Sequence, residues 1–374
     1  MPAPPFMLDQ RVFREAERQL IICNACRYCE GLCPVFPALE RRNRFLEGDI
    51  LYLANLCHDC RACVPACPYT APHELNIDVP NIMAQVRRET YAGYAAPRLF
   101  GRLFTKGARA AGIATVLSVA VVVLLVWVTR SDRLFEARVG PGAFYEVIPW
   151  LFMVIPAMIA TAYGLIVMAV GVLRFWRDTD APVRARLSPR ALISATTDVL
   201  VLRQMHGGGP GCSYPEERPT YWRVLYHQLI FYGFLGTFAA TTVAAIYQEF
   251  FGLLPPYPIL SLPVLLGTFG GVAQVIGCAG LIALRVRGAR QPATRVLMNL
   301  DVAFVGLLLA TNLTGLLLLI ARETSAMGLL LAVHLGVVAG LFITLPYNKF
   351  VHIIYRYAAL VQNRQEERTE SQPA

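Results

Sequence analysis

The cysteine-rich segment CNACRYCEGLCP at residues 23–34 recurs as CHDCRACVPACP at residues 57–68. Each copy has the spacing Cys-x2-Cys-x2-Cys-x3-Cys-Pro. In this pattern three thiolates wrap a short backbone segment around one [4Fe–4S] cluster, and the fourth cysteine, turned away by the proline, binds the other cluster. The duplicated pattern therefore predicts two [4Fe–4S] clusters.

The spacing also predicts which cysteines share a cluster. Paired zinc sites would need only two CxxC units, so the third cysteine, the x3 gap and the proline would be unexplained in both copies. Disulfides are disfavoured if this end of the chain faces the cytoplasm. We expect one cluster on Cys23, Cys26, Cys29 and Cys67, and the other on Cys57, Cys60, Cys63 and Cys33.

The rest of the chain is too apolar for a soluble protein. Of 374 residues, 56% are hydrophobic and 16% are charged. Beyond about residue 105 the sequence consists of apolar runs of ~20 residues, enough for a helix to span a bilayer. A cleavable signal peptide is not expected, because the N-terminus is polar. We predict six spans, at residues 110–129, 147–175, 226–250, 260–284, 302–320 and 328–355.

The arginines predict the orientation of these spans. They crowd the loops between the second and third spans and between the fourth and fifth, whereas the opposite loops have few. By the positive-inside rule, both termini should lie in the cytoplasm and the protein in the bacterial inner membrane. The net charge of +9 then reflects topology and lipid headgroups, and we expect no nucleic-acid partner.

Histidines in the apolar segments are the next informative set. An ionisable residue at membrane depth is costly, so a function is expected for His227, His334 and His352. Imidazoles from two facing helices commonly hold a b-type haem. His227 begins the third span and His352 closes the sixth on the same side. The two are therefore expected to meet and to supply both axial ligands of one haem facing the clusters.

His334 leaves the number of haems open. It precedes His352 by 18 residues, so in one continuous helix the two would share a face ~27 Å apart. A second haem would need a partner near Thr237 or Phe238, neither of which can ligate iron; a methionine of the second span is the substitute. One haem is favoured, two haems are the alternative, and His334 could instead bond across the bundle or to quinone.

The long loop at 177–222 contains HGGGPGC at residues 206–212. Its glycines permit close backbone approach but match no Walker or dinucleotide fingerprint. We expect this loop to shape the junction between clusters and haem, with a quinone headgroup site as the weaker alternative. Cys212 and Cys278 are expected to be free thiols, and His58 to tune or shield a cluster.

Together these patterns predict an all-α chain with three parts. Residues 1–100 should form a cytoplasmic, helical, ferredoxin-like domain with two clusters, and residues 101–360 a six-helix transmembrane, cytochrome-b-like bundle. Residues 361–374 should form a polar tail. The segment 37–56 is predicted to be helical, since its apolar residues are spaced to cover a core: Leu39, Phe45, Leu46, Ile50, Leu53 and Leu56.

Two further stretches carry a resemblance to a known family. GGGPGCSYP at residues 207–215 and YHQLIFYGF at residues 226–234, with the two cysteine runs, resemble the CitB-type tricarballylate utilisation protein B family. The resemblance covers nearly the whole chain. The last span, with His334, Pro346, Lys349 and His352, also looks like the last haem helix of nitrate-reductase-type cytochrome b subunits.

The resemblance implies an electron-transfer protein that reoxidises a cytoplasmic FAD-dependent tricarballylate dehydrogenase and reduces membrane quinone. No acid–base catalytic residue is expected in such a subunit. The chain departs from the two-haem pattern because the third span lacks a second histidine. A membrane-anchored iron–sulfur redox sensor is one alternative, and an electron-transfer subunit for a different flavoprotein is another.

Overall fold

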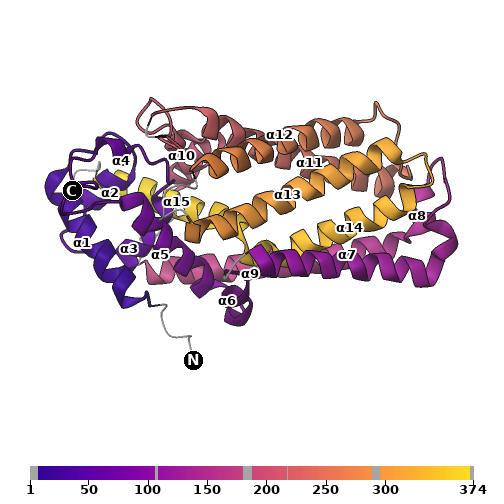
Figure 1. Ribbon diagram of the computed structural model, residues 1–374, viewed down its shortest axis with the longest axis horizontal. Helices are drawn as coiled ribbons and strands as arrows, with labels where there is room; N and C mark the ends of the chain where they lie inside the picture. The colour runs from indigo at the N-terminus through magenta and orange to yellow at the C-terminus, as the bar shows by residue number, and fades with distance from the viewer. Residues whose placement is uncertain (1–6, 106–107, 180–187, 217, 289–294, 371–374) are drawn as a thin grey trace.

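The computed structural model describes residues 7–105, 108–179, 188–216, 218–288 and 295–370. Within these ranges the chain is helical and forms no strand, apart from one isolated bridge between Cys212 and Thr220. A small domain of short helices lies at one end of a long helical bundle (Figure 1). The predicted all-α class is therefore confirmed.

The small domain contains helices α1 (Gln10–Cys26), α2 (Val35–Glu40), α3 (Glu47–Leu56), α4 (Cys63–Ala66) and α5 (Val79–Tyr94). Its core is built around α3, where Ile50, Leu53 and Leu56 are fully buried. The segment 37–56 is helical as predicted, but in two helices, because the chain breaks between α2 and α3. Asp49 accepts a hydrogen bond from the Leu46 backbone N–H (3.0 Å) and so starts a new helix. Leu46 is 54% exposed and does not join the core.

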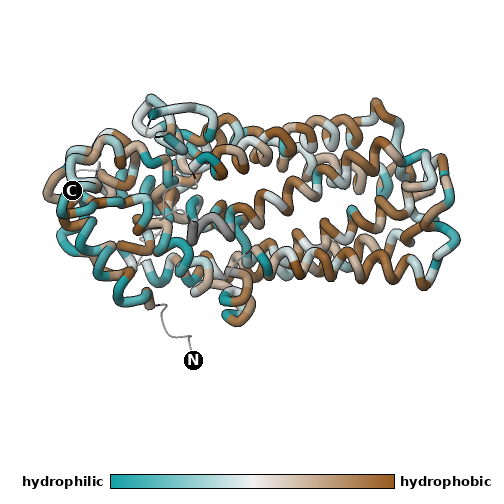
Figure 2. Tube along the Cα trace, viewed as in Figure 1, coloured by the Kyte–Doolittle hydropathy of each residue, from teal (hydrophilic) through white to brown (hydrophobic). Residues whose placement is uncertain are grey.

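Among the described residues, six helices are long and apolar enough to cross a membrane. They are α7 (Ala108–Arg130), α9 (Trp150–Asp178), α11 (Trp222–Phe251), α12 (Leu262–Gly288), α13 (Arg295–Ala321) and α14 (Met327–Thr344). Large apolar side chains such as Leu124, Phe152 and Phe269 are exposed on them, and the hydrophobic colouring covers the bundle (Figure 2). An apolar surface of this extent fits a lipid surrounding.

Glycines let two pairs of these helices approach closely. A Cβ added to Gly233 of α11 would lie 2.7 Å from the Gly270 carbonyl oxygen of α12. On α14, a Cβ added to Gly336 would lie 2.5 Å from the Val119 Cα of α7. These glycines therefore serve helix packing, as small residues do in membrane bundles.

The two ends of the bundle differ. At the far end the loops bond to one another: Gly142 N–H donates to the Pro255 carbonyl (2.8 Å), and Arg322 donates to the Tyr257 carbonyl (2.6 Å). At the near end lie the small domain and helix α10 (Pro189–Leu200), from the arginine-rich loop (Figure 1). The segments 180–187 and 289–294 of the arginine-rich loops fall outside the described residues.

The sixth span differs from its prediction. Helix α14 ends at Thr344, two short 3-10 turns follow (η5, Leu345–Tyr347; η6, Lys349–Val351), and a new helix α15 runs over His352–Glu370. Pro346 lacks a backbone N–H and ends the α-helical ladder. Asn348 is extended, and its side chain caps the next turn by accepting from the Phe350 N–H (2.8 Å). His334 and His352 therefore do not share one straight helix, and the separation predicted for them does not apply.

Helix α15 also replaces the expected polar tail, at least as far as Glu370. It runs into the small domain and packs on α3, α9 and α10. Leu360, Val361 and Asn363 are at most 1% exposed. Glu366 pairs with Arg42 (2.9 Å) and Arg41 (3.5 Å) of the small domain. The polar residues of this segment are thus interface residues between the domain and its own C-terminal helix.

Candidate cluster sites and membrane cavity

The first group of cysteines combines the first motif with the last cysteine of the second. Cys23, Cys26, Cys29 and Cys67 line one small hollow, together with apolar residues that include Phe36 and Ile77. Burial raises the pKa of the Cys23 thiol to about 12, and the neighbouring Cys29, Cys67 and Cys26 add to the rise. Cys67 therefore lies with the motif from which it is distant in sequence, as the crossed pattern predicts.

The second group of cysteines is more buried than the first. Burial raises the pKa of Cys33 well above its ordinary value, and the nearby thiols of Cys60 and Cys57 contribute. The pKa of Cys63 is raised in the same way, first by burial and then by the nearby thiols of Cys33, Cys57 and Cys60. In the described part of the chain, no three Cys, His, Asp or Glu side chains converge as ligands of a single metal ion would. The thiols that act on Cys33 belong to the second motif, and those that act on Cys63 include Cys33 and, more weakly, Cys29 of the first motif.

The glycine-rich loop at 206–212 lies against both motifs. A Cβ on Gly208, whose φ is +79°, would lie 3.0 Å from the Gly31 carbonyl oxygen of the first motif. A Cβ on Gly207 would lie 3.0 Å from the Ala62 Cβ of the second motif. The Ser213 N–H donates to the Cys60 carbonyl (3.0 Å). The close backbone approach predicted for these glycines is therefore confirmed, and its target is the cysteine domain.

A cavity of about 350 Å³ lies where this domain meets the bundle. Its wall is formed by three different parts of the protein. His58, Asp59 and Arg61 belong to the second cysteine motif, Arg87 belongs to α5, and Phe234, Phe304 and Leu308 belong to the bundle helices. The wall thus combines charged residues of the cysteine domain with apolar residues of the membrane-length helices.

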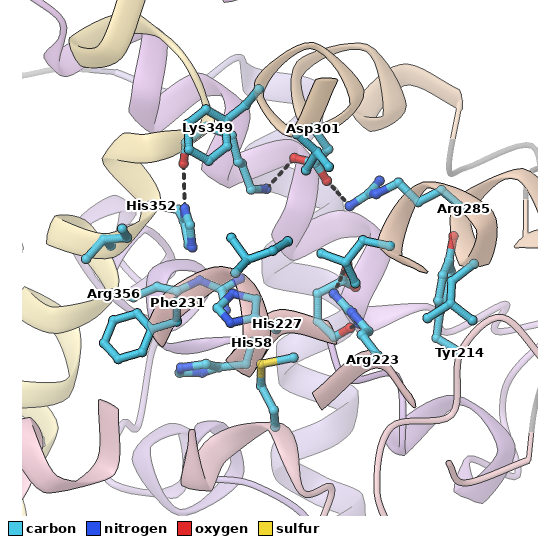
Figure 3. A pocket seen from close by; sticks show the side chains of 18 of the residues that line it. His58, Tyr214, Arg223, His227, Phe231, Arg285, Asp301, Lys349, His352 and Arg356 are labelled. Atoms are coloured by element: carbon cyan, nitrogen blue, oxygen red, sulfur yellow. Dashed lines mark hydrogen bonds and ion pairs between the residues drawn. The ribbon is translucent and has the colours of Figure 1, made fainter. Parts of the chain in front are cut away.

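His227 and His352 face one another in this cavity (Figure 3). Their ring centres are 6.2 Å apart and their planes are nearly perpendicular, at 89°. His352 Nδ1 bonds to the Lys349 carbonyl, so this nitrogen carries the proton and Nε2 keeps its lone pair. His227 Nδ1 is buried and has no hydrogen-bond partner in the described structure. The sequence prediction that these two residues meet is confirmed.

Charged side chains surround the histidine pair. Asp301 of α13 pairs with Lys349 (2.9 Å) and with Arg285. Asp59 lies 3.7 Å from Arg223, which also donates to the Asp59 carbonyl. Two more cations line the cavity, Arg87 and Arg356. With five cations and two carboxylates among these residues, the described wall carries a surplus of positive charge.

Other residues singled out in the sequence lie elsewhere. His334 is not paired with a histidine; its Nδ1 bonds to the Thr314 hydroxyl (3.0 Å) on the neighbouring helix. Cys212 donates to the Met205 carbonyl (3.0 Å), and Cys278 is buried in an apolar cluster of the bundle. Both cysteines are free thiols.

Asp301, Arg223 and Arg356 are cavity residues that sequence reasoning missed. Two signals could have found them. Asp301 is a carboxylate at the start of an apolar span, where an ionisable residue suggests a function. Arg223 and Arg356 each lie four residues from a singled-out histidine, which places them on the same helix face.

The fold and these sites define an all-helical protein in which an iron–sulfur-type domain is joined to six helices of membrane-spanning length and composition. More particularly, the chain belongs to the citrate utilization protein B family. The family model for citrate utilization protein B matches residues 105–373, and the model for its Fer4-like domain matches residues 16–93. These matches confirm the family resemblance and the iron–sulfur character of the N-terminal domain.

A curated relative supports the same family assignment. Citrate utilization protein B of Escherichia coli is 43% identical over 364 residues, which cover 96% of this chain and 93% of that protein. No solved structure matches the chain.

Proposed function

We propose that this protein carries electrons from a cytoplasmic FAD-dependent dehydrogenase, through two [4Fe–4S] clusters and one haem b, to quinone in the bacterial inner membrane. The resemblance to tricarballylate utilisation proteins and the name of the Escherichia coli relative support a tricarboxylate, tricarballylate or citrate, as the origin of the electrons. A flavin releases two electrons and a quinone takes up two electrons with two protons. One-electron centres between them let the pair pass singly.

The observation that carries this proposal is the meeting of His227 and His352 beside the second cysteine motif. Both imidazoles line the same cavity as His58, Asp59 and Arg61, which lie between the cysteines of that motif. The cavity therefore adjoins a cluster site on one side and the apolar helices on the other. A relay between the cytoplasm and the membrane needs this adjacency, whereas a sensor with one labile cluster does not.

The residues of the cavity fit a haem. Two imidazoles on opposite sides of one metal, with bonds of about 2 Å, hold their ring centres about 6 Å apart; the observed separation is 6.2 Å. The Lys349 carbonyl fixes the His352 tautomer with a free Nε2, as the partners of metal-bound histidines commonly do. The surplus of positive charge suits the two carboxylates of haem b. His227 and His352 would hold the haem, which would supply a one-electron centre when bound.

We propose one haem and not two. The second haem would require His334 and an opposite ligand, but a Cβ on Gly315 would lie 3.1 Å from the His334 ring, and Thr237 and Phe238 of α11 cannot ligate iron. The neighbouring helix α13 thus occupies the space on that side of the imidazole. The bond across the bundle, one of the alternatives for this residue, is the arrangement found.

We also propose the orientation of the protein in the membrane. The cysteine domain, α10 and α15 lie at the end of the bundle that carries the arginine-rich loops. Positive-inside topology would place this end, with both termini, in the cytoplasm. There the clusters are accessible to a soluble flavoprotein, while the cavity borders the membrane where quinone dissolves.

The test is the visible spectrum of the purified protein and of three histidine variants. We expect a b-type α-band after reduction with dithionite. His227→Ala and His352→Ala should each lose this band and keep the broad iron–sulfur absorption. His334→Ala is the matched control, a buried histidine in the same bundle, and should keep the haem. Wild-type protein without a b-type band, or a His352→Ala variant with a full one, would refute the proposed haem site.

A further inference from the structure

Each histidine of the pair has an arginine one helical turn away. Arg223 precedes His227 by four residues on α11, and Arg356 follows His352 by four residues on α15. Four residues of helix rise about 6 Å, and residues at this spacing share a face. Both arginines are displaced toward the cysteine domain, because α11 begins there and α15 runs toward it. All four side chains line the cavity (Figure 3).

The two arginines differ in their partners. Arg223 is engaged by the carboxylate and the carbonyl of Asp59. The other carboxylate of the cavity, Asp301, is engaged by Lys349 and Arg285. Arg356 forms no ion pair with any described carboxylate, and its Nε is buried without a hydrogen-bond partner.

The buried guanidinium of Arg87 lies near the half-buried Arg356. Arg87 of α5 is 3% exposed, and burial together with the charge of Arg87 lowers the pKa of Arg356. Arg87 Nη1 donates to the carbonyls of Ala54 (2.8 Å) and Cys57 (2.9 Å), but it too has no carboxylate partner in the described structure. Two neighbouring cations that lack an ion-paired carboxylate are unfavourable in a cavity, since partial burial removes much of the water that would screen them.

We propose that Arg356, supported by Arg87, is the binding site for the propionate carboxylates of the haem. This inference rests on the proposed function. The only anionic groups of haem b are its propionates, and guanidinium groups bind carboxylates through paired, charge-assisted hydrogen bonds. The rest of the macrocycle is apolar and matches the wall formed by Phe234, Phe304 and Leu308.

Arg87 gains a further role as a positioning residue. Its guanidinium contacts the backbone of Cys57, a predicted cluster ligand, and also lines the cavity. A propionate held by the two arginines would therefore be connected to the cluster site through one side chain. The domain-side end of the cavity thus combines anchoring of the haem with its placement next to the cluster.

The experiment compares haem with haem dimethyl ester, whose propionates are neutral. Haem-free protein in detergent is titrated with each compound, for the wild type and for Arg356→Gln. We expect Arg356→Gln to weaken haem binding roughly tenfold to hundredfold, the effect of losing a charge-assisted hydrogen bond, and to leave binding of the diester unchanged. The coupling between the two changes isolates the guanidinium–carboxylate interaction.

Redox titration gives a second readout. Arg356→Gln should lower the midpoint potential of the haem, because a positive charge near the iron favours the reduced form; Arg356→Lys should restore most of the shift. Arg364→Gln is the matched control: it is the same exchange on the same helix, but Arg364 bonds to Asp198 outside the cavity.

The outcomes separate the two proposals. If the wild type binds no haem, the proposed function and this inference both fall. If the wild type binds haem but Arg356→Gln weakens haem and diester equally, or changes neither binding nor potential, only the propionate site is refuted.

Discussion

Replacing Glu366 by glutamine should loosen helix α15 from the cysteine domain. The Glu366 carboxylate accepts from Arg42 Nη2 (2.9 Å) and Nη1 (3.3 Å), and lies 3.5 Å from Arg41. The side chains of Arg42 and Glu366 are only 12% and 15% exposed. The pair therefore lies inside the interface, where solvent screens it little. Because α15 begins at His352, this contact ties the cavity histidine to the domain.

The size of the destabilisation depends on the hydrogen bonds that Arg42 keeps after Glu366 is replaced. Removing one partner of a buried ion pair costs about 3–5 kcal/mol when the other charge is left unpaired. Arg42 keeps its bonds to Asp49 (2.7 Å) and to the Ala38 carbonyl (2.6 Å), so its charge stays compensated. We therefore expect a loss of about 2 kcal/mol, which is about a 30-fold rise in the equilibrium constant for local opening.

Amide hydrogen exchange by mass spectrometry measures this opening directly. Exchange in α15 and in the facing helix α3 should accelerate about 30-fold in Glu366→Gln. Glu15→Gln is the control, because Glu15 forms a surface pair with Arg18 in the same domain and is 42% exposed; about 1 kcal/mol or less is expected there. Exchange in Glu366→Gln that stays within a few-fold of the wild type would show that the ion pair does not hold α15 in place.

Two further predictions concern the cluster sites. Cys33→Ser should reduce the iron content by about half and damage the cluster of the second motif, because the fourth cysteine of each motif crosses to the other; EPR that shows loss confined to the cluster of Cys23, Cys26 and Cys29 would contradict the crossed assignment. Gly208→Ala should destabilise the loop by about 1–2 kcal/mol, since its φ of +79° suits only glycine, and should speed removal of iron by a chelator. Gly31→Ala, where an added Cβ meets nothing within 4 Å, is the neutral comparison.

The cysteine motifs and the spans could be predicted because local chemistry fixes them. A cluster is gripped by thiolates a few residues apart, so spacing alone identifies the site. A bilayer demands about 20 apolar residues per helix, so length and composition alone locate the spans. The number of spans then places the start of the third and the end of the sixth on one side. That parity brings His227 and His352 together even though the helix assumed between His334 and His352 is interrupted.

Features that depend on contacts between residues distant in sequence could be read only from the folded chain. Pro346 could have been accommodated as a kink within a continuous helix; the chain instead leaves the helix there and begins a new one at His352. Polar residues after residue 360 look like a solvated tail until Arg41 and Arg42, more than three hundred residues earlier in the chain, provide their counterions. Likewise, Arg223 and Arg356 have the same spacing from a histidine, but only the fold gives Asp59 to one and leaves the other without a carboxylate. Charge pairing is a property of contacts across the chain, and no local pattern encodes it.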